Sequence, residues 1–153
     1  MLEFVVYFDG ACEPRNPGGS MSWAWVVIED GDEMVARSDY RAAAPGNTNN
    51  RAEYFGLGCA MKAASEIIPN GAEFTVRGDA QLVIRQMTGE YSCNAPGLIP
   101  LRHKIATSIR EHGWKIAFEW VPREQNVRAD ALTRQEIESR GIKIPDRSKW
   151  KRR

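Results

Sequence analysis

Four acidic residues stand at positions from which α/β proteins commonly build functional sites. Asp9 ends a predicted strand, and Asp79 lies where a later strand meets a helix. Glu53 and Asp130 each lie in the first turn of a predicted helix. Carboxylate oxygens are the ligands that Mg²⁺ prefers, together with the phosphates of a substrate. Each acid alone also fits turn chemistry or stabilisation of a helix N-terminus, so it is the set of four that indicates a metal site.

The elements that must position these acids are predicted from the periodicity of the apolar residues. Strands are expected at residues 3–9, 22–29, 33–40, 73–77 and 115–121, and helices at about 50–67, 80–87, 98–112 and 127–139. The Asp30-Gly31 pair predicts a hairpin between the second and third strands. Three hairpin-linked strands, followed by strands alternating with helices, predict an α/β fold with one mixed sheet and helices packed on it.

Two glycines, Gly56 and Gly58, interrupt the first long helix. Each costs a helix roughly 1 kcal/mol relative to Ala. Their presence predicts that this helix packs closely against the sheet.

Length and composition fit one compact, soluble domain. The chain has 153 residues, of which 42% are apolar and 27% charged, and this is ordinary for a globular protein. We find no apolar run long enough to cross a bilayer and no secretory signal, so a cytoplasmic protein without a membrane partner is expected. Cys12, Cys59 and Cys93 lack zinc-binding spacing and are expected to be reduced thiols. No protein partner is indicated, and a monomer is expected.

The net charge of +1 hides an asymmetry along the chain. Residues 134–153 carry eight Lys or Arg and three Asp or Glu, a net +5, whereas residues 1–133 carry a net charge of −4. We therefore expect a domain at residues 1–139 followed by a basic tail at residues 140–153. Such a tail indicates either an interaction segment or a disordered, solubilising end.

Four sequence blocks resemble ribonuclease H type 1 in order and spacing, across roughly residues 3–138. They read YFDGACEPRNPGG, NTNNRAE, RGDAQLVIRQM and WVPREQNVRADAL. A single block carries little information, but the ordered set of four is specific. The resemblance implies a ribonuclease H-like fold, with a five-stranded mixed sheet flanked by helices, at residues 1–139.

The resemblance also implies an activity and a cofactor. It indicates an endoribonuclease that hydrolyses the RNA strand of RNA/DNA hybrids and leaves 5′-phosphate and 3′-hydroxyl ends. Two Mg²⁺ ions, for which Mn²⁺ can substitute, activate water and stabilise the leaving oxygen in such enzymes. By resemblance Asp9 bridges both ions, Glu53 and Asp79 hold the first, and Asp130 holds the second.

Four side-chain amides lie beside these acids in sequence: Asn16, Asn49, Asn50 and Gln81. An amide both donates and accepts hydrogen bonds, which suits contact with the 2′-hydroxyl that distinguishes RNA from DNA. The resemblance assigns these positions to the sugars and phosphates of the RNA strand. A plain turn at Asn16 and helix N-capping at Asn49 and Asn50 are the alternatives.

The chain departs from many family members in two segments. The loop before Asp130 reads PREQN and lacks the histidine that aids proton transfer or product release, so we expect Arg123 or Glu124 to take part of that role. The stretch YSCNAPGL replaces a basic, Trp-rich insertion. We therefore expect the basic tail to supply affinity for the hybrid. Its candidate residues are Lys143, Arg147, Lys149, Trp150, Lys151, Arg152 and Arg153.

Three other hypotheses remain open at this point. The main alternative is a non-catalytic RNA/DNA hybrid-binding module on the same fold, although a pure binder would gain no affinity from clustered negative charge near phosphates. Another nuclease or a strand-transfer enzyme of the same fold would lack the combined NPG, TNNRAE and DAQ strings. The third hypothesis is a domain taken from a reverse transcriptase.

Overall fold

The computed structural model describes residues 2–146, and it contains one five-stranded sheet in the order β3-β2-β1-β4-β5. β1, β2 and β3 pair in antiparallel fashion, whereas β4 pairs in parallel with both β1 and β5. The predicted mixed sheet is therefore confirmed. The strands are β1 (Phe4–Glu13), β2 (Ser20–Glu29), β3 (Asp32–Arg41), β4 (Glu73–Gly78) and β5 (Lys115–Trp120).

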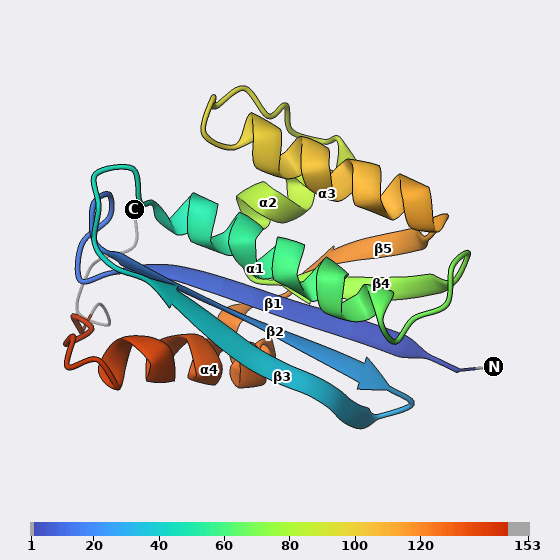
Figure 1. Cartoon of the computed structure of the whole chain (residues 1–153), viewed down its shortest axis with the longest axis horizontal. Coiled ribbons are helices and arrows are strands. Elements are labelled where there is room, and N and C mark those ends of the chain that lie inside the picture. Colours follow the sequence, from blue (N-terminus) through green and yellow to red (C-terminus); the bar gives the residue numbers. More distant parts are fainter. Residues whose placement is uncertain (1, 147–153) are drawn as a thin grey trace.

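Helices cover both faces of this sheet (Figure 1). Three of them, α1 (Asn49–Ser65), α2 (Gln81–Thr88) and α3 (Ile99–His112), lie on one face. The fourth, α4 (Val127–Glu138), packs alone on the other face, against β1, β2 and β3. A short 3-10 helix at Arg123–Gln125, which was not predicted from the sequence, leads into α4. Within the described residues, no helix has the length and apolar character needed to span a membrane.

The first strand is longer than predicted, and this changes the position of Asp9. The prediction ended the strand at Asp9, whereas β1 continues to Glu13 because its antiparallel pairing with β2 extends to the Glu13–Ser20 pair. The parallel pairing with β4 stops earlier, at Tyr7 and Arg77. Asp9 therefore lies within β1, just beyond the point where β1 and β4 separate. The Asp30-Gly31 hairpin is confirmed, since β2 and β3 pair in antiparallel fashion on either side of it and both residues have positive φ angles, 48° and 83°.

Close packing of α1 on β1 explains one of the two helix glycines. A Cβ atom on Gly56 would lie 2.5 Å from the carbonyl oxygen of Asp9, so no larger residue fits there. Gly10 plays the matching role on β1, because its Cβ would lie 2.3 Å from the backbone nitrogen of Glu53. The prediction was wrong for Gly58, which faces α3 and would leave its Cβ 3.9 Å from Ile105.

Candidate active site

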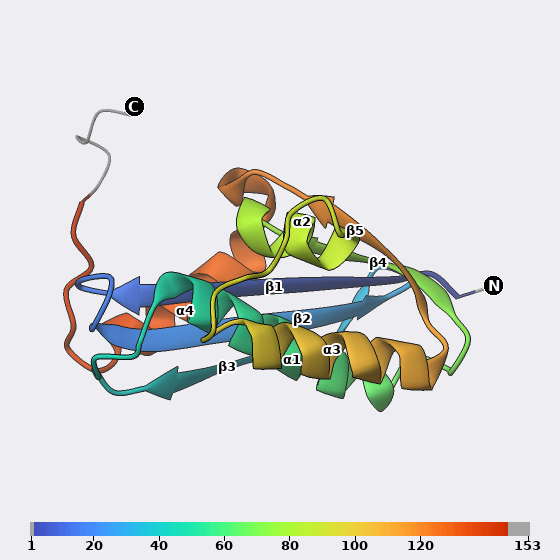
Figure 2. The same cartoon turned by 90° about the horizontal axis from the view of Figure 1, so that it is seen from above.

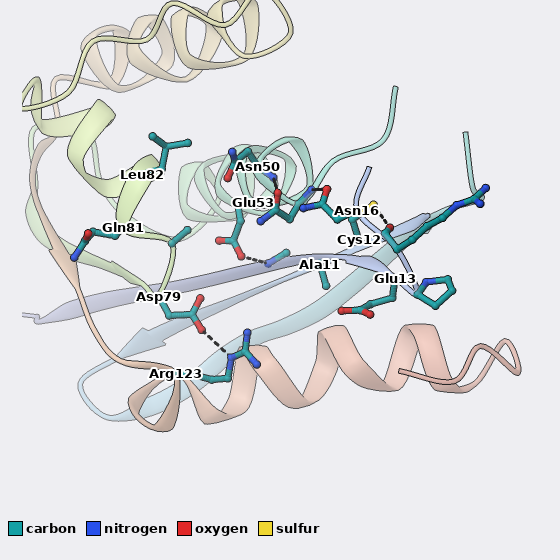
Figure 3. A pocket seen from close by; sticks show the side chains of 15 residues that line it. Ala11, Cys12, Glu13, Asn16, Asn50, Glu53, Asp79, Gln81, Leu82 and Arg123 are labelled. Atoms are coloured by element: carbon teal, nitrogen blue, oxygen red, sulfur yellow. Dashed lines mark hydrogen bonds and ion pairs between the residues drawn. The ribbon is translucent and has the colours of Figure 1, made fainter. Parts of the chain in front are cut away.

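Three of the four predicted acids converge on one point. Carboxylate oxygens of Asp9, Glu53 and Asp79 lie within 4.8 Å of one another. β1 supplies Asp9, α1 supplies Glu53, and Asp79 directly follows β4. Figure 3 shows Glu53 and Asp79 pointing toward the same space beside β1. Three acids that are distant in sequence therefore form one cluster of oxygen ligands.

Glu53 lies deeper in its helix than predicted. The side chain of Thr48 caps α1 by accepting a hydrogen bond from the backbone N–H of Arg51, so the helix begins at Asn49 and Glu53 falls in the second turn. Glu53 is buried, and its Oε1 accepts a hydrogen bond of 2.8 Å from the backbone N–H of Gly10. Its Oε2 is also buried, and no hydrogen-bond partner exists for it among the described residues. A buried carboxylate oxygen without a donor is suited to a cation.

Burial and mutual repulsion make these acids difficult to ionise. Burial, and after it the negative charge of Asp79, raises the pKa of Asp9 from 3.8 to about 8. The pKa of Glu53 is raised well above its ordinary value by burial and then by the charges of Asp9 and Asp79. Burial also raises the pKa of Asp79, while the nearby Arg123 guanidinium acts in the opposite direction. A bound cation would lower these pKa values, because it stabilises the ionised carboxylates.

Asp130 lies near this cluster and outside its tightest part. It occupies the first turn of α4, as predicted, and its charge contributes to the raised pKa of Asp9 and of Asp79. Asp9 and Asp130 line a common cavity of about 930 Å³. The start of α4 is fixed by Asn126, whose buried side chain donates a hydrogen bond of 2.9 Å to the carbonyl oxygen of Phe8. Asn126 belongs to the fourth sequence block, but the sequence alone did not predict this positioning role.

All four predicted amides lie around the acids. Asn16, Asn49, Asn50 and Gln81 line a cavity of about 760 Å³ together with Glu53, Asp79 and Arg123 (Figure 3). The Oδ1 atom of Asn16 accepts a hydrogen bond from the backbone N–H of Asn49, which joins the loop after β1 to the start of α1. Because Thr48 is the N-cap, the capping alternative for Asn49 and Asn50 is wrong.

Arg123 occupies the loop in which many family members carry a histidine. Its Nε lies 3.8 Å from Oδ2 of Asp79, while 71% of its side chain remains exposed. It lines both the cavity of the amides and the cavity shared by Asp9 and Asp130. The guanidinium is therefore an accessible positive charge beside the acids, whereas Glu124 lines only the second cavity.

A second missed residue is Asn47, which is fully buried beside the loop after β1. Its Nδ2 donates hydrogen bonds to the carbonyl oxygens of Gly19 and Ala42, and its own carbonyl oxygen accepts from Gly18. These bonds hold the Asn16 loop against the segment that precedes α1. The sequence signal was an asparagine directly before the TNN string.

The described part of the predicted tail passes beside the acids. Ile144, Pro145 and Asp146 line the cavity that Asp9 and Asp130 share. The predicted contacts of Arg147, Lys149, Trp150, Lys151, Arg152 and Arg153 lie outside the described residues.

Comparisons with known proteins agree with the arrangement of these residues. The model of a family described as "Reverse transcriptase-like" matches residues 7–136. The chain is 34% identical over 141 residues to ribonuclease HI of Halobacterium salinarum, covering 86% of this chain and 63% of that protein. It is also 33% identical over 131 residues to a bifunctional protein of Mycobacterium tuberculosis, of which the match covers 34%. The chain thus spans less than two thirds of these relatives.

Solved structures extend the agreement to three dimensions. The crystal structure of RNase H1 from Halobacterium salinarum superimposes with a TM-score of 0.77 at 33% identity, covering 90% of this chain and 98% of that one. LC11-RNase H1, crystallised in complex with an RNA/DNA hybrid, gives a TM-score of 0.79 at 29% identity, with 90% and 99% covered. Sequence blocks, sheet order and the convergence of the acids thus lead to one conclusion: the chain belongs to the ribonuclease H type 1 family.

Proposed function

We propose that this protein is an endoribonuclease that hydrolyses the RNA strand of RNA/DNA hybrids and leaves 5′-phosphate and 3′-hydroxyl ends. The observation that carries the proposal is the cluster of Asp9, Glu53 and Asp79, with its donor-less Glu53 Oε2, beside a cavity lined by side-chain amides. The structure of the relative LC11-RNase H1 with an RNA/DNA hybrid supports the choice of substrate.

The donor set fits Mg²⁺, because all four acids offer the hard oxygen ligands that this ion requires. Asp9, Glu53 and Asp79 would hold one ion, and Asp9 with Asp130 would hold a second, with Mn²⁺ as a substitute. When bound, two such ions supply an activated water and stabilise the leaving oxygen. Without a bound cation, the raised pKa of Asp9 and of Glu53 favours the protonated form of these two carboxyl groups.

The remaining residues of the site bind and orient the substrate. Asn16, Asn49, Asn50 and Gln81 contact the sugars and phosphates of the RNA strand, because amides can pair with a 2′-hydroxyl as donor or acceptor. Arg123 places its exposed guanidinium toward a phosphate beside Asp79, which supplies positive charge where many family members carry a histidine. Negative charge that develops on the phosphate during hydrolysis is stabilised by such a group.

Residues 1–139 form the catalytic domain in this proposal, and residues 140–153 are a basic tail that adds affinity for the hybrid. The protein acts as a cytoplasmic monomer. Sedimentation of the full chain tests the monomer directly, and a dimeric mass at micromolar concentration would contradict it.

The activity is tested with 5′-labelled RNA/DNA, RNA/RNA and DNA/DNA duplexes of one sequence, with Mg²⁺ and with EDTA. We expect cleavage of the hybrid only, dependent on the metal, with product ends identified by their response to phosphatase and ligase. Tight hybrid binding without cleavage in Mg²⁺ or Mn²⁺ would instead favour the non-catalytic binding module.

A further inference from the structure

A second groove lies on the side of α1 that faces away from the acids. It has a volume of about 610 Å³ and runs between α1 and α3, which contact each other. Figure 2 shows α3 lying over α1. Successive helix residues are rotated by about 100°, so the groove residue Phe55 points roughly opposite to Glu53. The groove is therefore separate from the candidate active site, and a role for it does not depend on the proposed hydrolysis of hybrids.

The floor of this groove is apolar, and Gly58 keeps it open. Tyr54, Met61 and Ile105 are buried beneath it, and Leu101 forms one wall. A Cβ atom on Gly58 would meet Ile105 only at 3.9 Å, so packing does not require a glycine at this position. The glycine nevertheless weakens the helix relative to Ala. Its structural effect is to leave a hollow that a partner's side chain can fill.

The rim of the groove is positively charged. Arg41, Lys62 and Lys104 line it and are exposed, and His112 closes one end. No Asp or Glu is among its lining residues, and no ion pair among the described residues engages these three cations. Burial raises the pKa of the Cys59 thiol in this groove, and the charge of Asp39 on β3 acts in the same direction, whereas Lys62 lowers this pKa. Such a rim is unexpected on residues 1–133, whose net charge is −4.

The apolar floor of the groove indicates which class of partner it can bind. Single-stranded nucleic acid binds by stacking bases on free aromatic faces. Phe55 already lies under the guanidinium groups of Arg41 and Arg51, at 4.9 and 5.4 Å from its ring centroid, and Trp23 and Tyr54 are buried. The apolar floor suits aliphatic or aromatic side chains, and the rim suits carboxylates. An acidic peptide that also carries apolar side chains satisfies both.

We propose that the α1–α3 groove is a docking site for an acidic, apolar peptide segment of a partner protein. One apolar side chain occupies the hollow above Gly58, and flanking carboxylates pair with Arg41, Lys62 and Lys104. The groove follows α1 from Phe55 to Ser65, about 15 Å at 1.5 Å per residue. That length accommodates four or five residues of extended chain at about 3.3 Å each.

The test uses fluorescence anisotropy of a labelled octapeptide of alternating Asp and Leu with the full chain. We expect saturable binding that the Lys62→Gln/Lys104→Gln variant weakens about tenfold, since two surface ion pairs together contribute roughly one power of ten in affinity. The matched control, Lys115→Gln/Arg128→Gln, removes the same charge from outside the groove and should bind like the parent. Equal weakening by both variants, or no binding by the parent, overturns the proposal.

A second variant tests the contribution of the hollow at Gly58 to peptide binding independently of the charged rim. Gly58→Leu fills the groove, and leucine favours a helix, so the melting temperature should not fall while peptide binding is lost. An all-Asp octapeptide should bind weakly to every variant. If labelled dT8 binds with the same dependence on Lys62, Lys104 and Gly58, and the Asp-Leu peptide does not, the groove takes nucleic acid and the proposal is wrong.

Discussion

Removing one acid from the candidate metal site should stabilise the metal-free protein. The variant is Asp9→Asn, which keeps the size of the side chain and removes its charge. Burial and the charge of Asp79 raise the pKa of Asp9 from 3.8 to about 8. Below pH 3.8 the carboxyl is protonated in both the folded and the unfolded state. Between pH 3.8 and about 8 the folded state retains a proton that the unfolded state has lost.

The sign and size of the effect follow from this difference in bound protons. Stability falls as pH rises wherever the folded state binds more protons. One proton contributes about 1.4 kcal/mol per pH unit. The cost of Asp9 is therefore about 2 kcal/mol at pH 5 and about 4 kcal/mol at pH 7. The Asn variant is free of this cost, so its advantage should grow across that interval.

Urea unfolding of parent and variant in EDTA, at pH 5 and at pH 7, measures the difference. Added Mg²⁺ should reduce the difference in the free energy of unfolding between variant and parent at pH 7. The ion stabilises the ionised carboxylates of the parent and binds the variant less well. A variant that is less stable than the parent at both pH values, or an advantage that does not change with pH, would refute the reasoning. The matched control is Asp32→Asn, which removes an exposed acid at the start of β3.

Three further predictions concern activity. Asp79→Asn should lower kcat for the hybrid by about 10²–10³, because several kcal/mol of charge stabilisation are lost; unchanged turnover in a folded variant would contradict the metal site. Arg123→Gln should lower kcat about tenfold and Arg123→Lys less, and an effect confined to KM would instead mean that Arg123 only binds substrate. Replacing the tail cations with Gln should raise KM at low salt and make KM less dependent on salt, with the slope falling by roughly 0.9 for each phosphate that the tail no longer neutralises. If KM of parent and variant depends on salt in the same way, the tail does not bind the hybrid. The tail positions are Lys149, Lys151, Arg152 and Arg153.

The sequence predicted the order of the elements because apolar periodicity is a local property. It did not predict how far β1 continues, because Gly10 and Pro14 are typical loop residues and only the pairing with β2 extends the strand to Glu13. The 3-10 helix in the PREQN loop was missed for the same reason, since single turns carry no periodic signal.

Residue types and their order in the sequence predicted which residues form the candidate site. The geometry of the site could not be predicted in this way, because it depends on tertiary packing. The sequence placed Glu53 in a first helical turn, where helix-dipole stabilisation would be an ordinary explanation. In the structure it is one turn deeper and buried against Gly10, where that explanation no longer applies. Asn126 and Asn47 could not be recognised as positioning residues, because their hydrogen-bond partners Phe8 and Gly19 are far away in sequence.

Two glycines of α1 show how one helix can serve two different surfaces. Gly56 permits contact with the carbonyl oxygen of Asp9, and this contact brings Glu53 to the acids. Gly58 lies about 200° further around the helix, makes no such contact and opens a cationic groove instead. The two substitutions to Ala should therefore differ. Gly56→Ala must displace backbone and should cost stability and metal affinity together, whereas Gly58→Ala should stabilise the helix by roughly 1 kcal/mol and leave hydrolysis unchanged.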